Sequence, residues 1–442
     1  MGLGYIAAVL EKIHEVFIID VLAEGLTLET FAERISVLAP EIVGITSDTI
    51  SFQRAIDMAQ KIKEIKNDII VVIGGAHTNA FIDYPLQYNC FDVAVYGEGE
   101  RTIVELLEKI SEGLSFETVK GIAFRQDGRT VVNSPRELIE DLNSLPFPAR
   151  HLFSMSKYNL GSGSMLDVLP VFTVNTSRGC PYRCRFCSNN KAFGKKYRSR
   201  NAQNVVDEIE MLQRDYGAKG IYFREDLFTL QSQRVIEICK EIRRRKIEVK
   251  WECECRVNTV SEKMLLSMKE SGCEVVWFGV ESGSQRVLNY IQKDITLDQV
   301  RKAFELCSKI GLRAGASFLI GLPGETLEDI EQTVSFASEL KPRLEFAWFN
   351  IYVGLPISPL YEHVRKNRLY SKDIGHGILI IQTAEFDRSM LESLQKRANR
   401  KVNFWKHRKK LIRRAICEIR NGTINRRKIF KGINQLLLSR GV

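Results

Sequence analysis

The sequence predicts an α/β protein with two sheets, because strand-like and helix-like segments alternate in two separate regions. Residues 170–355 hold six short apolar runs with helical segments between them, and residues 1–115 show a second alternation of this kind. Residues 141–148, with two prolines, oppose regular structure and read as a linker. Six β/α units in sequence order imply a parallel sheet with right-handed crossovers.

The elements of the second region follow from their apolar periodicity. Strands are predicted at 171–177, 220–225, 249–255, 274–282, 313–321 and 345–353, and helices at 202–216, 231–245, 261–271, 296–310 and 326–339. Six units are too few for an eight-stranded barrel, so we expect an open partial (β/α)6 barrel. Its active groups should lie at the carboxyl ends of the strands, where parallel α/β folds place their chemistry.

The first region has a doubly wound pattern of flavodoxin-like type. Strands are predicted at 16–20, 41–47, 69–74 and 92–96, and helices at 3–13, 27–38, 51–65 and 100–112. The chain starts directly in a helix, so the first strand of such a domain is expected to be missing. Residues 120–133 predict a hairpin that turns at Asp127-Gly128.

Composition and charge narrow the class of protein. The 442 residues are 44% hydrophobic, the apolar runs are too short to span a bilayer, and no signal-peptide pattern occurs, so we expect a cytoplasmic protein. The net charge of +10 belongs to the tail, because residues 391–442 hold 16 Lys and Arg against 2 acidic residues. The amphipathic basic stretch 401–416 could contact an anionic membrane surface, an acidic partner or nucleic acid, but the solvated face of a helical cap is the more common case.

Three cysteines carry the strongest chemical signal. Cys180, Cys184 and Cys187 follow the first barrel strand with C-x3-C-x2-C spacing. Thiolates are the soft ligands of iron–sulfur clusters, and three of them can hold three corners of a 4Fe–4S cube. A structural zinc site is the alternative, although zinc prefers four ligands. Cys253 and Cys255 could bind a second metal, but packing against a helix layer is the simpler interpretation.

The cysteine motif, together with Phe186 just before the third cysteine, resembles the radical S-adenosylmethionine (SAM) superfamily. The resemblance implies that the open iron binds SAM and that an electron from the cluster cleaves SAM to a 5′-deoxyadenosyl radical. It also implies domain limits: a barrel over 151–360, preceded by a hairpin and linker over 116–150 and followed by a basic helical region over 361–442.

Further barrel residues match family positions around SAM, each at the end of a predicted strand. By this resemblance the SAM-binding residues are Glu225, Asp226, Arg256, Glu281, Ser282, Gly321 and Gly324. For Asp226, a helix N-cap is an additional interpretation. The later segment Gly354-Leu-Pro-Ile-Ser-Pro359 departs from the usual family form.

The strand ends of the first region resemble the cobalamin-binding domain that precedes many radical SAM cores. The residues expected against cobalamin are Gly44, Ser47, Gly74, Gly75, Gly97 and Gly99, since glycines let a backbone approach a large flat ligand closely. The cobalt-ligand motif Asp-x-His-x-x-Gly is absent, so His77 is not expected to bind cobalt. A vestigial domain that binds nothing is the alternative.

The resemblance implies an enzyme of the group that includes the anaerobic magnesium-protoporphyrin ester cyclases. Cobalamin-dependent methylation of an unactivated carbon is the predicted reaction. Radical ring closure or rearrangement, and a non-catalytic cobalamin sensor, remain as alternatives. Methylthio transfer to transfer RNA is disfavoured, because those enzymes carry three further cluster cysteines and the N-terminal region here offers only Cys90.

The expected partners follow from this chemistry. They are a small-molecule substrate and a one-electron donor such as flavodoxin or ferredoxin, whereas no nucleic-acid partner is expected.

Overall fold

The computed structural model describes residues 1–158, 163–188, 193–374 and 377–403. The described chain divides into two compact units. The N-terminal unit draws on residues 1–158, 178–199 and 353–383, and the barrel unit draws on residues 163–177, 200–352 and 384–403. The division shows that the cysteine segment belongs to the N-terminal unit, although barrel-unit segments flank it in sequence.

The N-terminal unit contains a five-stranded sheet with the order β1-β2-β3-β4-β5. Its strands are β1 (Ile42–Thr46), β2 (Ile70–Gly74), β3 (Val93–Val95), β4 (Ile122–Gln126) and β5 (Arg129–Val132). The first three strands are parallel, and β4 and β5 add an antiparallel hairpin at one edge. Asp127 and Gly128 both have positive φ values, which is the conformation of a tight hairpin turn, so the predicted turn is confirmed.

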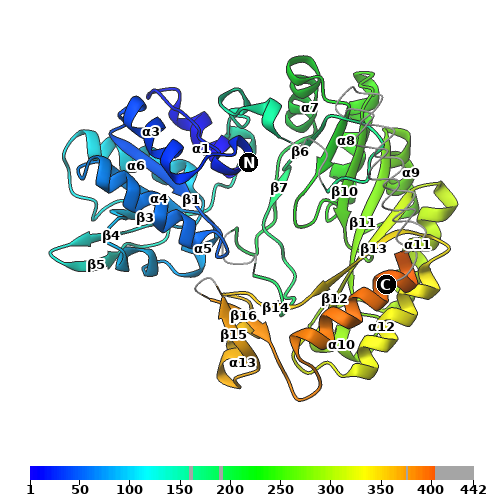
Figure 1. The fold of residues 1–442 in the computed structure, drawn as a ribbon. Helices are drawn as coiled ribbons and strands as arrows, with labels where there is room; N and C mark the ends of the chain where they lie inside the picture. Colours follow the sequence, from blue (N-terminus) through cyan, green and yellow to red (C-terminus); the bar gives the residue numbers. More distant parts are fainter. Residues whose placement is uncertain (159–162, 189–192, 375–376, 404–442) are drawn as a thin grey trace, which may run out of the picture. The chain divides into compact units, whose positions relative to one another are not determined.

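Helices cover both faces of this sheet, as the doubly wound prediction requires (Figure 1). Helices α3 (Leu28–Leu38) and α4 (Phe52–Ile65) enclose one apolar core, in which Phe52 and Ile62 are fully buried. Helices α1 (Gly2–Leu10) and α6 (Gly99–Ser111) enclose the core of the other face around Leu106. Two short helices, α2 (Val21–Glu24) and α5 (Ala76–Ala80), were not expected from periodicity.

The strand predicted at 16–20 is wrong. These residues have no regular structure, and β1 forms the edge of the described sheet. Val16 packs against the core around Leu106 and Ile19 packs against the core around Phe52. The apolar alternation that suggested a strand therefore reflects side-chain packing rather than ladder hydrogen bonds.

Smaller elements complete the N-terminal unit. A two-stranded sheet pairs β7 (Ser177–Arg178) with β8 (Arg198–Ser199), and a three-stranded sheet has the order β14-β16-β15. The latter comprises β14 (Val353–Gly354), β15 (Tyr370–Ile374) and β16 (Ile378–Ile381), beside α13 (Pro359–Lys366). Single 3-10 turns lie at Tyr84–Gln87, Leu142–Ser144, Arg150–Leu152 and Met155–Lys157.

The barrel unit is a six-stranded parallel sheet with the order β13-β12-β11-β10-β9-β6. Its strands are β6 (Val171–Val174), β9 (Gly220–Phe223), β10 (Lys250–Cys255), β11 (Cys273–Glu281), β12 (Arg313–Ile320) and β13 (Leu344–Ile351). Each strand lies beside its successor in sequence, as expected for repeated β/α units. The predicted six-stranded partial barrel is confirmed.

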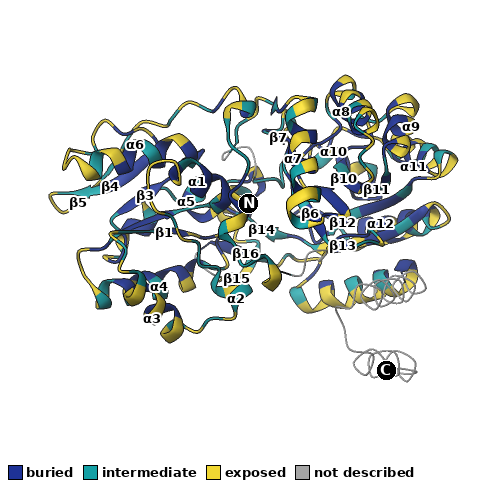
Figure 2. Cartoon of the chain, turned by 90° about the horizontal axis from the view of Figure 1, so that it is seen from above, coloured by how far each residue is buried: buried dark blue, intermediate teal, exposed yellow. Residues whose placement is uncertain are grey.

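The barrel helices are α7 (Ala202–Tyr216), α8 (Ser232–Arg244), α9 (Glu262–Glu270), α10 (Gln285–Tyr290), α11 (Leu297–Ile310) and α12 (Leu327–Leu340). Side-chain caps start α7 at Asn201, α9 at Ser261, α11 at Thr296 and α12 at Thr326. Figure 2 shows that these helices expose one face and bury the other against the strands. Phe223, Trp251 and Phe278 are among the large side chains buried completely or almost completely there.

Residues 388–403 are helical, and the basic stretch 401–416 lies outside the described residues from 404 onward. Within the described part of the chain, no helix is long and apolar enough to cross a membrane.

Candidate functional site

Residues 179–197, which we call the cysteine loop, connect β7 to β8 and carry Cys180, Cys184 and Cys187. Cys184 is buried, whereas Cys180 and Cys187 are partly exposed. The Cys180 amide donates to the Gly194 carbonyl at 3.3 Å, and the Cys187 amide donates to the Cys184 carbonyl at 3.2 Å. The loop therefore folds back on itself and presents three thiols within eight residues.

The fit of this loop to a cluster rests on donor type and spacing. Among the described residues, these three thiols included, no three His, Cys, Asp or Glu side chains are arranged to hold a single metal ion. The assignment of the three thiols as cluster ligands stays a prediction from the sequence.

Every residue predicted for the SAM site lies at the carboxyl end of a parallel strand in the barrel unit. Glu225 and Asp226 follow β9, Arg256 follows β10, Glu281 ends β11 and Ser282 follows it, and Gly321 and Gly324 follow β12. Because neighbouring parallel strands end at one sheet edge, these residues share the edge that the sequence predicted. Their individual environments differ, however.

The Glu225 carboxylate is hydrogen-bonded to neighbouring segments of the protein. Its buried carboxylate accepts hydrogen bonds from the Thr176 amide, from Thr176 Oγ1 at 2.8 Å and from the Ser177 amide at 2.8 Å. These contacts fix the chain between β6 and β7. Glu225 therefore orients the segment that leads into the cysteine loop.

Asp226, by contrast, is exposed. Desolvation, with a smaller contribution from neighbouring Glu225, raises the pKa of its carboxyl group to about 6. The side chain is therefore ionised above that pH and can pair with a cation there. Of the two acidic residues predicted after β9, Asp226 is the more exposed.

Glu281 forms a buried ion pair with Lys293, whose Nζ lies 2.6 Å from Glu281 Oε1. Glu281 adopts φ = 69°, a left-handed conformation that is uncommon for a non-glycine residue. A Cβ at Gly279 would lie 2.6 Å from Glu281 Oε1 and 2.9 Å from Lys293 Nζ, so the pair rests directly over that glycine. Lys293 was missed by the sequence reasoning, and only its position 12 residues after Glu281 hinted at a partner.

Ser282 and Arg256 are both buried. Ser282 Oγ lies 3.0 Å from Thr333 Oγ1 and accepts a hydrogen bond from the Ser284 amide at 3.1 Å. Arg256 Nε donates to Asn258 Oδ1 at 2.9 Å. Both side chains thus make structural contacts at the strand ends, and their role toward a ligand stays a prediction.

Gly321 and Gly324 form a turn that Glu325 closes. Both glycines have φ = 83°, the region that favours glycine. Glu325 Oε2 accepts hydrogen bonds from the amides of Gly321 at 2.6 Å and Leu322 at 3.0 Å, and Glu325 is almost completely buried. Burial raises the pKa of the Glu325 carboxyl group to about 8, so it is largely protonated at neutral pH.

In the N-terminal unit, the residues predicted for cobalamin lie at or near the carboxyl ends of β1, β2 and β3. Hydrogen bonds tie these strand ends together: the His77 amide donates to the Ser47 carbonyl at 3.1 Å, and the Gly97 amide donates to Asn79 Oδ1 at 2.6 Å. A Cβ at Gly44 or Gly97 would meet no atom within 4 Å, whereas one at Gly75 would lie 2.6 Å from the Ser47 carbonyl oxygen. Gly75 is therefore required by the loops themselves.

Two hydroxyl groups support a ligand at these strand ends. Ser47 Oγ and Thr78 Oγ1 are buried and find no hydrogen-bond partner among the described residues. A buried polar group without a partner is costly, and a bound ligand is one way to satisfy it. Cobalamin carries peripheral amides that could satisfy both hydroxyls, and the residues present therefore fit this cofactor.

His77 is enclosed by aromatic rings. It is fully buried, its ring stacks on Phe52 with centroids 3.8 Å apart, and its Nδ1 lies 3.3 Å from Thr49 Oγ1. That His77 does not bind cobalt stays a prediction from the sequence.

The remaining candidate thiols, those of Cys253 and Cys255, lie on strand β10 of the barrel sheet. Cys253 and Cys255 are buried, with their Sγ atoms 3.5 Å apart. Burial raises the pKa of the Cys253 thiol well above its ordinary value, which disfavours the thiolate that metals require. Core packing therefore remains the better interpretation of these two residues.

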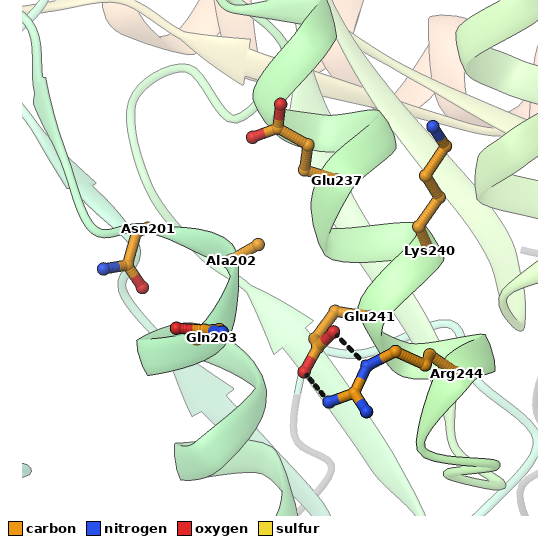
Figure 3. A pocket seen from close by; sticks show the side chains of 7 residues that line it. All are labelled: Asn201, Ala202, Gln203, Glu237, Lys240, Glu241 and Arg244. Atoms are coloured by element: carbon orange, nitrogen blue, oxygen red, sulfur yellow. Dashed lines mark hydrogen bonds and ion pairs between the residues drawn. The ribbon is translucent and has the colours of Figure 1, made fainter.

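A surface hollow of about 450 Å³ lies between α7 and α8 (Figure 3). Its lining residues are Asn201, Ala202, Gln203, Glu237, Lys240, Glu241 and Arg244. Glu241 and Arg244 pair there through two hydrogen bonds of 2.7 and 2.8 Å. None of the predicted site residues lines this hollow.

The sequence matches two known protein families. The pattern of the radical SAM superfamily matches residues 174–337, and that of the B12 binding domain matches residues 1–107. An uncharacterized methyltransferase of Pyrococcus horikoshii is 38% identical over 370 residues, which cover 84% of this chain and 79% of the relative. The chain belongs to the radical SAM superfamily. It combines the radical SAM core with an N-terminal B12-binding domain.

Two further similarities agree with this membership. The anaerobic magnesium-protoporphyrin IX monomethyl ester cyclase of Rubrivivax gelatinosus is 30% identical over 357 residues, which cover 79% of this chain but 63% of that enzyme. The structure of the radical SAM methyltransferase TsrM from Kitasatospora setae, with cobalamin and a 4Fe–4S cluster bound, superposes with a TM-score of 0.71 at 20% identity. That superposition covers 83% of this chain and 72% of TsrM, and it shows the shared fold.

Family membership makes this radical SAM protein an enzyme, and its cofactors are a 4Fe–4S cluster, SAM and cobalamin. The predicted fold class and family are therefore confirmed. The residues that bind each cofactor are proposals, taken up below.

Proposed function

We propose that this chain is a cobalamin-dependent radical SAM methyltransferase that methylates an unactivated carbon of a small molecule. The observation that carries the proposal is the pairing of both family patterns in one chain whose 38% identical relative is described as a methyltransferase. The buried hydroxyls of Ser47 and Thr78 support it independently, because they suit a ligand of the B12-binding domain.

In this proposal each part of the chain has a defined task. Cys180, Cys184 and Cys187 provide three thiolates for the cluster. The bound cofactors supply the electron that cleaves SAM and the methyl group that is transferred. Asp226 offers a carboxylate to the ammonium group of SAM, and the Gly97 backbone leaves room for a flat macrocycle.

The experiment is an anaerobic reaction of the reduced, cobalamin-loaded enzyme with SAM that carries a deuterated methyl group. A methyltransferase of this kind should form both 5′-deoxyadenosine and S-adenosylhomocysteine, and bound cobalamin should acquire the deuterated methyl group. Mass spectrometry detects all three. Absence of S-adenosylhomocysteine together with an unlabelled cobalamin would refute methyl transfer through cobalt.

Radical ring closure is the second candidate, favoured by the 30% identity to the magnesium-protoporphyrin ester cyclase. It predicts 5′-deoxyadenosine without S-adenosylhomocysteine in the same experiment. A protein that acts only as a cobalamin sensor would form neither product.

The proposal extends to partners and location. Reduction of the cluster needs a one-electron donor, such as a flavodoxin or ferredoxin. A reducing compartment keeps such a cluster intact, which supports a cytoplasmic location. Each donor can be tested by its ability to replace a chemical reductant in the SAM cleavage assay.

A further inference from the structure

Two arginines close the base of the cysteine loop. Arg178 on β7 precedes the loop and Arg198 on β8 follows it, and the two strands pair in one sheet. Gly179 has φ = 85°, and a Cβ there would lie 2.3 Å from the Lys196 carbonyl oxygen. The two ends of the loop therefore run in close contact, so a group that holds them also restricts the three cysteines between them.

Both arginines form ion pairs with the same carboxylate, that of Glu98. Arg198 Nη1 lies 2.9 Å from both oxygens of Glu98, and Arg178 Nη1 lies 3.1 Å from Oε1. Arg178 Nη2 also pairs with Glu100 at 2.5 Å. The Glu98 and Arg198 side chains are 2% and 1% exposed, so this pair is shielded from water.

Two of the Arg198 donors also reach the surrounding backbone. Arg198 donates to the Ile139 carbonyl at 2.7 Å and to the Phe193 carbonyl, within the cysteine loop, at 2.9 Å. The Ile139 amide donates back to Glu98 Oε2 at 2.7 Å. Glu98 thus sits at the centre of a hydrogen-bond network that includes the loop itself.

Glu98 comes from the B12-binding domain. It lies between Gly97 and Gly99, where β3 ends and α6 begins, and the Gly97 amide is held by Asn79 from the preceding strand end. The proposed cobalamin loop therefore also supplies the carboxylate that holds the cysteine loop.

We propose that Glu98 is a positioning residue for the iron–sulfur cluster: through Arg178 and Arg198 it fixes both ends of the cysteine loop, so the B12-binding domain sets the geometry of the three thiols. This inference rests on the proposed function in assigning the cluster to Cys180, Cys184 and Cys187. It does not depend on which reaction the enzyme performs.

The test uses the full-length chain with Glu98→Gln and, separately, Arg198→Lys. Glu98→Gln removes the shared charge, whereas Arg198→Lys keeps a charge but loses the planar fork that reaches two carbonyls and the carboxylate. Glu105→Gln is the matched control, because Glu105 lies on α6 and pairs with Arg136 away from the cysteine loop. Each protein is examined in two ways, without iron and after anaerobic reconstitution with iron and sulfide.

Hydrogen exchange of the iron-free proteins should rise at least tenfold in peptides from residues 179–197 in both variants, with exchange unchanged elsewhere except around Ile139, which is hydrogen-bonded to Glu98 and Arg198. After reconstitution and gel filtration, iron per chain should fall at least threefold in both variants. The Glu105→Gln control should match the wild type in both measurements.

Wild-type exchange at 179–197 together with wild-type iron retention in both variants would overturn the inference. Global unfolding of both variants would also overturn it, since Glu98 would then be a general stabilising residue. If wild-type protein itself retains no iron, the proposed function fails, while the exchange measurement still decides whether Glu98 holds the loop.

Discussion

At the scale of single residues, we propose that two buried hydroxyls of the B12-binding domain hydrogen-bond to cobalamin. Ser47 and Thr78 are buried at neighbouring strand ends, and neither hydroxyl has a partner among the described residues. Each polar group of this kind costs about 1–3 kcal/mol when it is left unsatisfied. A ligand that hydrogen-bonds to both hydroxyls removes this free-energy cost, and its removal favours binding.

Ser47→Ala and Thr78→Val are therefore expected to change two quantities in opposite directions. The cofactor-free variants should be more stable than the wild type by about 1 kcal/mol each, because an unsatisfied hydroxyl is removed. Their affinity for cobalamin should fall about fivefold, which corresponds to one lost hydrogen bond. Thermal denaturation and equilibrium dialysis measure the two effects, and Thr130→Val on the exposed strand β5 serves as the control. Unchanged cobalamin affinity in both variants would remove these hydroxyls from the binding site.

Lys293 offers a second test at this scale. Lys293→Met leaves Glu281 buried without its counter-charge, so we expect a loss of about 3 kcal/mol in stability and weaker SAM binding. Lys309→Met breaks the exposed pair with Glu262 and should cost less than 1 kcal/mol. Urea denaturation and SAM dialysis compare the two. Equal effects of the two substitutions would contradict a special role for the Glu281–Lys293 pair.

At the scale of elements, the strand ends of the barrel are held by their own side chains. Glu225 fixes the exit from β6, and Glu325 closes the turn after β12. Both residues lie at the edge where cofactors are expected, yet both accept hydrogen bonds from backbone amides, and Glu225 also accepts one from the Thr176 hydroxyl. These carboxyl groups shape the loops on which other residues can contact SAM.

The Glu325 turn predicts a specific pH dependence of stability. The pKa of Glu325 is raised to about 8 in the folded protein, so between its unfolded pKa and pH 8 the unfolded state binds fewer protons than the folded state. Stability should therefore decrease as pH rises through this window, by at most about 5 kcal/mol from this residue. Glu325→Gln should remove that part of the decrease, so its unfolding midpoint in urea should exceed the wild-type midpoint increasingly from pH 5 to pH 9. A constant difference between the two proteins across this range would contradict the raised pKa.

At the scale of the whole molecule, the chain passes between its two units several times. The cysteine loop and residues 353–383 belong to the N-terminal unit, although the barrel strands lie between them in sequence. The three thiols proposed for the cluster thus belong to the N-terminal unit, in which we propose that the Glu98 network holds the ends of their loop. The large core of the barrel, around Trp251 and Phe278, serves to align the strand ends.

The cluster assignment makes a prediction for the intact protein. Anaerobically reconstituted wild-type chain should bind about four iron atoms, and replacing Cys180, Cys184 and Cys187 together by alanine should abolish this iron and its visible absorption. Cys253→Ala should leave the iron content unchanged, because that thiol is fully buried and disfavours ionisation. Retention of iron by the triple variant would show that the cluster, if present, is held elsewhere.

Local sequence determined the elements and the order in which they follow one another. The periodicity of the six barrel strands and the Asp127-Gly128 turn are short-range signals, and the structure confirms both, whereas the strand predicted at 16–20 is wrong. The cysteine spacing is equally local, so the family could be inferred before any coordinates.

Tertiary structure alone decided which partners the site residues have. Glu98 meets Arg198 across 100 positions, Glu225 meets Thr176 across 49, and Lys293 reaches Glu281 only because a loop returns over Gly279. Residues 16–20 show the same limit, since their alternation is that of a strand while ladder pairing depends on a distant neighbour. Periodicity and motif spacing record what a segment can form, whereas burial and charge pairing depend on segments that only folding brings together.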